Sequence, residues 1–400
     1  MKVVQSYIEY LQPDSFKIEI DYAYIIMLSS LLLKKHYGGS TLYTNEITSN
    51  YFSDIGFPLE YNIDVVNKYH SKIFSLSKFA TMAHQNEPFI HCDLDTLILK
   101  KPNLSIKKSP YIFSHPDVKV LDDALNKDDS YQSHILSKEN LDLYDSYLKN
   151  YYLLKDDFKY HKEKFNWPGN DYIDFQDIPN MNFIAVKEEF DIMKTSINDT
   201  LNIVNETHLN NNKQWSDAMF IEQFCFPIYL KKYNSRFNKI CKRNSVEKFK
   251  YKKSQFLLSR APTLEIPYVD STEKIKNGTF DELFPLKFRV NQYCTECNRN
   301  HNIVHKIKTP KELGDNLNLD FLGFYHVGGS NKKIPILQAM IIGHIIKHFG
   351  EEYVMRVHNY FKKQIYSKQG LVNKISHGEY LYEYLSGNKI FTSSFKSSIF

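Results

Sequence analysis

The first hundred residues alternate between strand-like and helix-like segments, and this alternation constrains the fold more than any other feature of the chain. The strand-like segments are short and apolar, whereas the helix-like ones are longer, and two of them stop at Gly38-Gly39 and at Gly56. Alternating strands and helices are typical of a mostly parallel sheet flanked by helices. The sequence therefore predicts an α/β fold, with strands at 2–6, 40–44 and 88–92 and helices at 22–35, 46–55 and 71–85.

The rest of the chain is less regular. We expect two insertions, a polar one at about 107–167 and a basic one without a clear period at about 242–308. Between them, 181–186 and 217–233 have the pattern of a second β/α segment. Two helices are predicted at 334–348 and 351–364, separated by Gly350. The expected organisation is one domain at 1–333 that contains both insertions, followed by a helical C-terminal extension at 334–400.

Charge, hydropathy and cysteine usage narrow the classes of function. The net charge of +5 comes from 51 basic and 46 acidic side chains, a balance too even to indicate a nucleic-acid partner. The first residues lack the apolar core of a signal peptide, and the apolar stretch Tyr22 to Leu33 is too short to span a bilayer. Five cysteines do not form a disulfide framework. We therefore expect a cytoplasmic protein, and the aromatic, basic tail at 380–400 leaves open a peripheral contact with the inner membrane face.

Two aspartates follow the apolar segment that ends at Cys92. In an extended chain Asp93 and Asp95 point to the same side, and the carboxyl ends of strands are where open α/β sheets bind ligands. Two such carboxylates suit Mg²⁺ or Mn²⁺, which in turn can bind a diphosphate. A turn or helix cap built from two aspartates is the structural alternative. A phosphatase of the haloacid dehalogenase type fits poorly, because its motif needs Thr or Val where this chain has Leu97.

A second cluster follows another apolar run and comprises His326, Gly328, Gly329 and Lys332. A neutral imidazole can join two carboxylates around one metal ion. The glycines allow a phosphate to approach the backbone closely, and the lysine adds a positive charge beside it. A glycine turn with a surface histidine and solvated lysines is the alternative.

With both clusters in view, the chain resembles glycosyltransferases of the GT-A fold, and most closely glycosyltransferase family 8 and related bacterial proteins. The resemblance extends over most of the first 350 residues as short islands. The family's Asp-x-Asp is matched by Asp93 and Asp95, and its His-x-x-Gly-x-x-Lys by His326, Gly329 and Lys332. The resemblance implies a nucleotide-diphospho-sugar transferase fold in which Asp93, Asp95 and His326 bind the metal ion and Lys332 contacts the diphosphate.

Three further islands supply candidate donor-binding and catalytic residues by the same resemblance. Lys78 stands where the family has a basic residue facing the donor, and Asn182 where it has a residue that contacts the donor sugar, although the family's Gly is Ile184 here. Glu222 and Gln223 resemble a pair that lies near the reacting carbon, with Asp217 as the alternative; an exposed helix face is the structural explanation for this pair. The implied activity is retaining transfer from a UDP-sugar to a glycan, lipid-linked saccharide or protein, as in polysaccharide biosynthesis.

A separate cluster, Cys294, Cys297, His301 and His305, has the ligand types of a structural zinc site, with reduced thiols and surface histidines as the alternative. Two other classes of function also remain open. A nucleotidyltransferase would share Asp93 and Asp95 but would not need His326 beside them. A non-catalytic glycan- or partner-binding protein on the same fold would hydrolyse no nucleotide sugar.

Overall fold

A computed structural model describes residues 1–9, 18–66, 74–105, 109–114, 179–206, 220–233, 237–239, 255–256, 286–294, 299–307, 309–320, 322–328, 332 and 335–367. Within these residues the fold is a mixed α/β structure around a seven-stranded sheet of order β3-β2-β1-β4-β7-β6-β8. Neighbouring strands pair in parallel except β7, which runs antiparallel to β4 and β6. The predicted, mostly parallel central sheet is confirmed.

The elements around this sheet follow in chain order. The first half contains β1 (Lys2–Ser6), α1 (Ile20–Tyr37), β2 (Thr41–Tyr43), α2 (Glu46–Ile55), β3 (Glu60–Asn62), α3 (Ser75–Ala83), β4 (Phe89–Cys92), β5 (Thr96–Leu97), β6 (Tyr111–Phe113) and β7 (Phe183–Val186). The second half contains α7 (Phe190–Glu206), the π-helical turn η5 (Phe220–Cys225), α9 (Phe226–Lys232), β8 (Phe237–Lys239), β9 (Gln255–Phe256), β10 (Leu286–Cys294), β11 (Arg299–Ile307), α11 (Pro310–Asn316), β12 (Tyr325–His326), α12 (Pro335–Phe349) and α13 (Glu351–Ser367).

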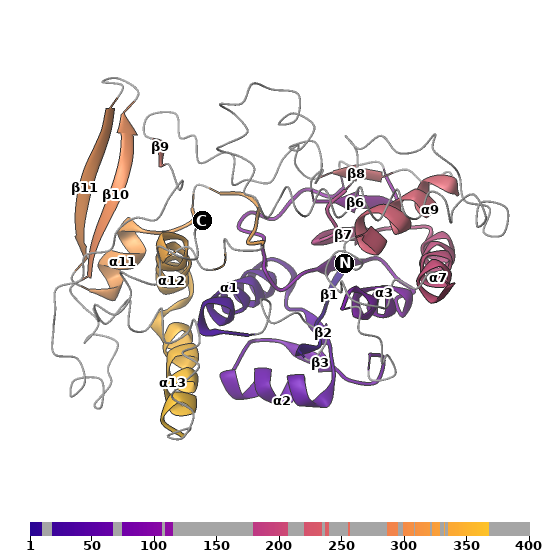
Figure 1. Ribbon diagram of the computed structural model, residues 1–400, viewed down its shortest axis with the longest axis horizontal. Coiled ribbons are helices and arrows are strands. Elements are labelled where there is room, and N and C mark those ends of the chain that lie inside the picture. Colours follow the sequence, from indigo (N-terminus) through magenta and orange to yellow (C-terminus); the bar gives the residue numbers. More distant parts are fainter. Residues whose placement is uncertain are drawn as a thin grey trace.

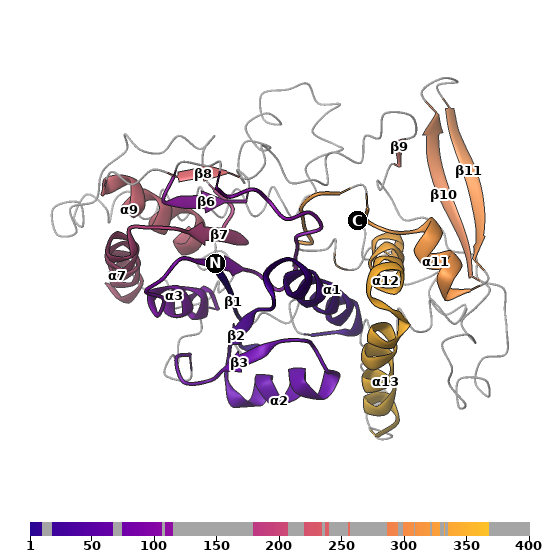
Figure 2. The same cartoon turned by 180° about the vertical axis from the view of Figure 1, so that it is seen from behind.

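Helices cover both faces of the sheet. Successive side chains of a strand point to opposite faces, so an apolar strand needs packing partners on each face. On β1, Val3 packs in the cluster that contains Leu33 of α1, whereas its neighbour Val4 packs with Phe79 of α3. Figures 1 and 2, from opposite sides, show α1, α12 and α13 on one side of the sheet and α3, α7 and α9 on the other. The apolar sequence of strands such as β4 follows from this double coverage.

Helix α1 is buried along most of its length. Its residues from Ile20 to Leu33 are all buried, because the helix packs in one cluster with α2, α11, α12 and α13. A helix that is apolar on all sides is typical of such a position. It ends at Gly38, which adopts φ 90° and donates its N–H to the Lys34 carbonyl at 3.0 Å.

The sequence predicted most of these elements, and α2 has the predicted bounds. Its start is set by the Asn45 side chain, which accepts from the Thr48 N–H at 2.8 Å, and its end by Gly56 with φ 83°. Two expectations need correction. The first insertion does not begin at 107, since β6 at Tyr111–Phe113 belongs to the central sheet.

The second correction concerns the segment 242–308, for which we predict neither a strand nor a helix from the sequence. β10 and β11 form an antiparallel pair there that joins β9 in a separate three-stranded sheet beyond α11 (Figure 1). The predicted C-terminal helices correspond to α12 and α13, and the tail at 380–400 lies outside the described residues. None of the described helices has the length and apolar composition that a bilayer crossing requires.

Candidate functional site

The two aspartates lie at the carboxyl end of β4, which pairs with β1 on one side and β7 on the other. The pairing of β4 with β7 is continued by Asp93, whose N–H donates to the Asn182 carbonyl at 2.8 Å. A turn follows, in which the Thr96 N–H donates to the Asp93 carbonyl at 3.1 Å. This end of a central strand is the position where α/β sheets bind ligands.

His326 reaches the aspartates through a small two-stranded sheet. β12 pairs antiparallel with β5, so that His326 lies opposite Thr96, and the Val327 N–H donates to the Asp95 carbonyl at 2.9 Å. As a result His326 Nε2 lies 3.5 Å from Asp95 Oδ1. A Cβ on Gly328 would lie 3.1 Å from His326 Cε1, so the glycine leaves room for the imidazole.

Lys332 completes this half of the site. Its Nζ lies 2.7 Å from Asp95 Oδ2 and 4.1 Å from the centre of the Tyr22 ring of α1. The Asp95 carboxylate therefore offers one oxygen to a histidine and the other to a lysine. Burial would raise the pKa of Asp95, but Lys332 and His326 together lower it below its usual value, so this carboxyl is ionised at neutral pH.

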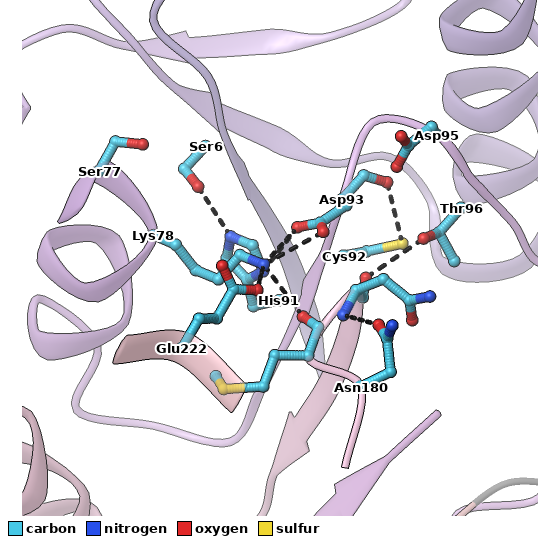
Figure 3. A network of polar contacts seen from close by, with 12 residues as sticks. Ser6, Ser77, Lys78, His91, Cys92, Asp93, Asp95, Thr96, Asn180 and Glu222 are labelled. Carbon is cyan, nitrogen blue, oxygen red and sulfur yellow. Dashed lines mark hydrogen bonds and ion pairs between the residues drawn. The ribbon is translucent and has the colours of Figure 1, made fainter. Parts of the chain in front are cut away.

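The other half of the site is centred on Lys78 of α3 (Figure 3). Its Nζ lies 2.9 Å from Asp93 Oδ1, donates to the Met181 carbonyl at 3.2 Å and forms an ion pair with Glu222 Oε1. Burial would lower the pKa of Lys78, yet the two carboxylates raise it. Burial, together with the charge of Asp93, raises the pKa of Glu222 to about 7 against the opposing effect of Lys78.

Glu222 is 4% exposed, so the explanation of this residue as part of an exposed helix face is wrong. It lies on η5, a π-helical turn, and such turns are frequent at functional sites. Its direct ion pair with Lys78 was not anticipated from the sequence, in which 144 residues separate the two. Nothing local in either segment indicates this contact.

Asn182 contributes a buried amide whose Nδ2 and Oδ1 atoms make no hydrogen bond with any of the described residues. Its backbone is fully used: the N–H donates to Asn180 Oδ1 at 2.9 Å, and the carbonyl accepts from Asp93 and from Thr96 Oγ1. A buried amide without partners is costly, by about 1–3 kcal/mol. A buried amide without partners, in a residue whose backbone is hydrogen-bonded to Asp93, is typical of a residue that binds a ligand.

His91 lies beneath the site and was not among the predicted residues. It is fully buried, its Nε2 is 2.9 Å from Ser6 Oγ, and its Nδ1 is 3.8 Å from Asp93 Oδ1. Burial, and then Lys78, lower the pKa of His91 far below its usual value, so the imidazole is neutral. The alternation of β4 could have indicated it, because His91 is two residues before Asp93 and shares its side of the strand.

Several predicted residues cannot be placed. Asp217, Gly329 and Cys297 lie outside the described residues, as does the side chain of Gln223. For the zinc cluster only strand backbone is described, in which Cys294 pairs with Arg299 and Gln292 with His301. At about 3.4 Å per residue, the α-carbons of His301 and His305 are about 14 Å apart along β11, which is far for two ligands of one ion. The zinc site stays a prediction.

The arrangement suits a ligand that carries both negative charge and hydrogen-bonding groups. Asp95 and His326 offer an oxygen and a nitrogen to a divalent cation, Lys332 offers positive charge, and Asn182 offers a free donor and acceptor. Glu222, with a pKa near neutrality, can exchange a proton at physiological pH. Metal binding, anion binding and proton transfer can therefore occur at one edge of the sheet.

Comparisons with known proteins add little to this geometry. Residues 1–152 match the model of a family described as a family of unknown function (DUF6734). No curated protein sequence matches the chain. Among solved structures, an apo structure of the bifunctional glycosyltransferase WbbM aligns with 10% sequence identity and a TM-score of 0.28, over 60% of this chain and 38% of that one. The chain thus spans 38% of the length of that structure, and a similarity this low carries no argument about fold or activity.

Proposed function

We propose that the protein is a metal-dependent glycosyltransferase with a GT-A-like fold, which transfers a sugar from a nucleotide sugar, a UDP-sugar in our proposal, with retention of configuration. The observation that carries the proposal is the meeting of Asp95, His326 and Lys332 at the carboxyl end of β4. These residues come from two segments about 230 positions apart, and they match the spacing of the family 8 motifs. Chance placement of this histidine and this lysine on the two oxygens of one carboxylate is a poor alternative.

The residues present fit a divalent cation. Ligand atoms that share an ion at about 2.1 Å lie roughly 3 Å apart, and Asp95 Oδ1 and His326 Nε2 are separated by 3.5 Å. The Lys332 ammonium occupies only the other oxygen of Asp95. Asp93 would supply a further oxygen, since its side chain is 27% exposed. A mixed oxygen and nitrogen set favours Mn²⁺ over Mg²⁺.

A cation held by Asp93, Asp95 and His326 would neutralise the departing nucleoside diphosphate. Lys332 would bind a diphosphate oxygen directly, together with the Gly329 backbone. Asn182 would hold hydroxyl groups of the donor sugar, which gives its buried amide the partners it lacks. Lys78 would keep Asp93 and Glu222 in position and balance their charge.

Glu222 is the residue we place beneath the reacting sugar, with Gln223 beside it and Asp217 as the alternative. A carboxylate there would stabilise the positive charge that develops on the ring carbon during transfer. The acceptor is proposed to be a glycan, a lipid-linked saccharide or a protein, with the enzyme acting in the cytoplasm or at the inner membrane face. Polysaccharide biosynthesis is the matching role.

The test is a screen of nucleotide sugars with Mn²⁺, in which thermal stabilisation and slow donor hydrolysis are measured. We expect a UDP-sugar to stabilise the wild type, and Asp95→Asn and His326→Ala to lower hydrolysis by about 100-fold or more. Asp54→Asn, at an exposed aspartate of α2, is the matched control and should behave as wild type. Circular dichroism on each variant checks that the fold is retained.

Other outcomes identify the rival functions. Donor binding without metal-dependent hydrolysis or transfer would indicate a binding protein. Release of pyrophosphate from a nucleoside triphosphate that is insensitive to His326→Ala would indicate a nucleotidyltransferase. If no donor binds and Asp95→Asn has no effect, the proposal fails.

A further inference from the structure

A second group of metal-ligating side chains lies at the contact between α11 and α12. His344 and His348 are four residues apart on α12 and therefore lie on one face of the helix. Asp320 approaches them from the segment that follows α11. None of these three residues belongs to the candidate site at the end of β4.

The approach of Asp320 is fixed by close packing of the backbone. A Cβ on Gly343 would lie 1.9 Å from the Leu317 carbonyl oxygen, so only glycine lets α12 come this near to the end of α11. The same approach brings the Leu319 N–H to 3.3 Å from His344 Nδ1. Asp320, the next residue, is therefore held over the two imidazoles by packing and does not depend on a flexible side chain alone.

The distances are those of a preformed ligand set. Asp320 Oδ1 lies 2.5 Å from His348 Nε2 and 3.5 Å from His344 Nδ1, and one ligand atom from each residue lies within 4.8 Å of the others. Lys347 Nζ contacts the other carboxylate oxygen, Oδ2, at 2.7 Å. The lysine thus turns Oδ1 toward the imidazoles and leaves it available.

We propose that His344, His348 and Asp320 bind a divalent transition-metal ion, with Zn²⁺ as the best match. Two imidazoles and one carboxylate are a common set for Zn²⁺, and a water molecule would take the fourth position. The ion would take the place of the proton between His348 Nε2 and Asp320 Oδ1. It would also replace the hydrogen bond that His344 Nδ1 accepts from the Leu319 N–H. Because Asp320 and His348 are exposed, the ion can enter from solvent.

The electrostatics of the cluster agree with this assignment. Burial, and then the neighbouring His348, lower the pKa of His344 to about 4, so this imidazole is neutral and has a lone pair at physiological pH. The positive charges of Lys35 and Lys347 also lower the pKa of His344, and they would repel a metal cation. Lys347, however, is already paired with Asp320. Lys35 lies over the Phe349 ring, 5.6 Å from its centre.

Binding would connect α12 to the segment that leads into β12. Asp320 precedes His326 by six residues, so an ion here would fix the start of the strand that carries the candidate ligand of the first site. The role is structural, and it does not depend on the proposed transferase activity. A plain hydrogen-bonded cluster of the same residues would not respond to metal.

The test uses the full chain stripped with EDTA and equilibrated with Zn²⁺, with bound metal counted after dialysis and the urea midpoint measured with and without Zn²⁺. His348→Ala and Asp320→Asn should each bind one Zn²⁺ fewer per chain, or bind it at least tenfold more weakly, and should lose the Zn²⁺-dependent rise in midpoint. His348 and Asp320 are partly exposed, so both variants should fold; circular dichroism checks this.

Two controls separate this site from the others. His84→Ala, at an exposed histidine after α3, and Asp95→Asn, in the candidate active site, should both keep the ion. Equal stoichiometry and affinity in wild type, His348→Ala and Asp320→Asn would overturn the inference. So would loss of the same ion in Asp95→Asn but not in His348→Ala.

Discussion

The ion pairs of Lys78 allow the sharpest test of the candidate site. The side chains of Lys78 and Glu222 are only 7% and 5% exposed, and Lys78 also contacts Asp93. Lys78→Met keeps most of the volume but removes the positive charge that is paired with Asp93 and Glu222. Removal of one partner from a buried pair costs about 3–5 kcal/mol, because the remaining charge is left without compensation. We expect a loss of this size in the free energy of unfolding.

The loss should also depend on pH. The folded-state pKa of Glu222 is already raised to about 7, so its protonated form stabilises the fold, and this contribution is lost as pH rises from about 4.5 to 7. Without Lys78 the folded-state pKa of Glu222 rises further. Each additional pKa unit lowers the free energy of unfolding by about 1.4 kcal/mol at a pH above the new pKa. The difference between wild type and Lys78→Met should therefore widen between pH 7 and pH 9.

Urea unfolding followed by circular dichroism at pH 6, 7, 8 and 9 measures both effects. The double variant Lys78→Met with Glu222→Gln should recover about 2 kcal/mol of the loss and most of its pH dependence, since one buried charge is then absent. Lys311→Met, at an exposed lysine of α11, is the matched control. A loss below about 1 kcal/mol that does not change with pH would refute the reasoning.

Three further predictions concern stability and binding. Gly343→Ala should destabilise the protein by about 1–3 kcal/mol or more in urea unfolding, because its Cβ would overlap the Leu317 carbonyl, whereas Gly323→Ala, with open space around it, should be nearly neutral. Asn182→Leu should raise the free energy of unfolding by about 1–3 kcal/mol, because it removes an unpaired buried amide, and should weaken nucleotide-sugar binding in calorimetry. In metal-free buffer, the depressed pKa of His344 makes the unfolded state bind more protons than the folded state between pH 4 and 6.5. As the pH rises through that range, the free energy of unfolding of the wild type, measured in urea, should therefore increase by about 3 kcal/mol relative to that of His344→Gln.

Local chemistry in the sequence determined much of the fold before any contact was known. The bounds of α2 follow from the Asn45 cap and from Gly56, and the end of α1 follows from Gly38. The apolar run of β4 and the aspartates after it placed Asp93 and Asp95 at a strand end. These features depend on backbone preferences and on side-chain periodicity within a few residues, which a sequence displays directly.

Contacts across long stretches of chain were decided by the tertiary structure. The pairing of β5 with β12 brings His326 to Asp95, and the sequence supported this meeting only through the family resemblance. Two contacts have no signal in the sequence. One is the ion pair of Lys78 with Glu222, and the other is the cluster of Asp320, His344 and His348. β10 and β11 were missed for a related reason, since their stability comes from pairing with each other.

The sequence by itself determined most strands and helices of the first hundred residues and the polar side chains at their ends, because those preferences act over short distances. The tertiary structure decided which of those side chains lie close enough to form ion pairs and hydrogen bonds. That choice depends on burial and on distances of a few ångströms between residues up to 230 positions apart, which local periodicity does not encode.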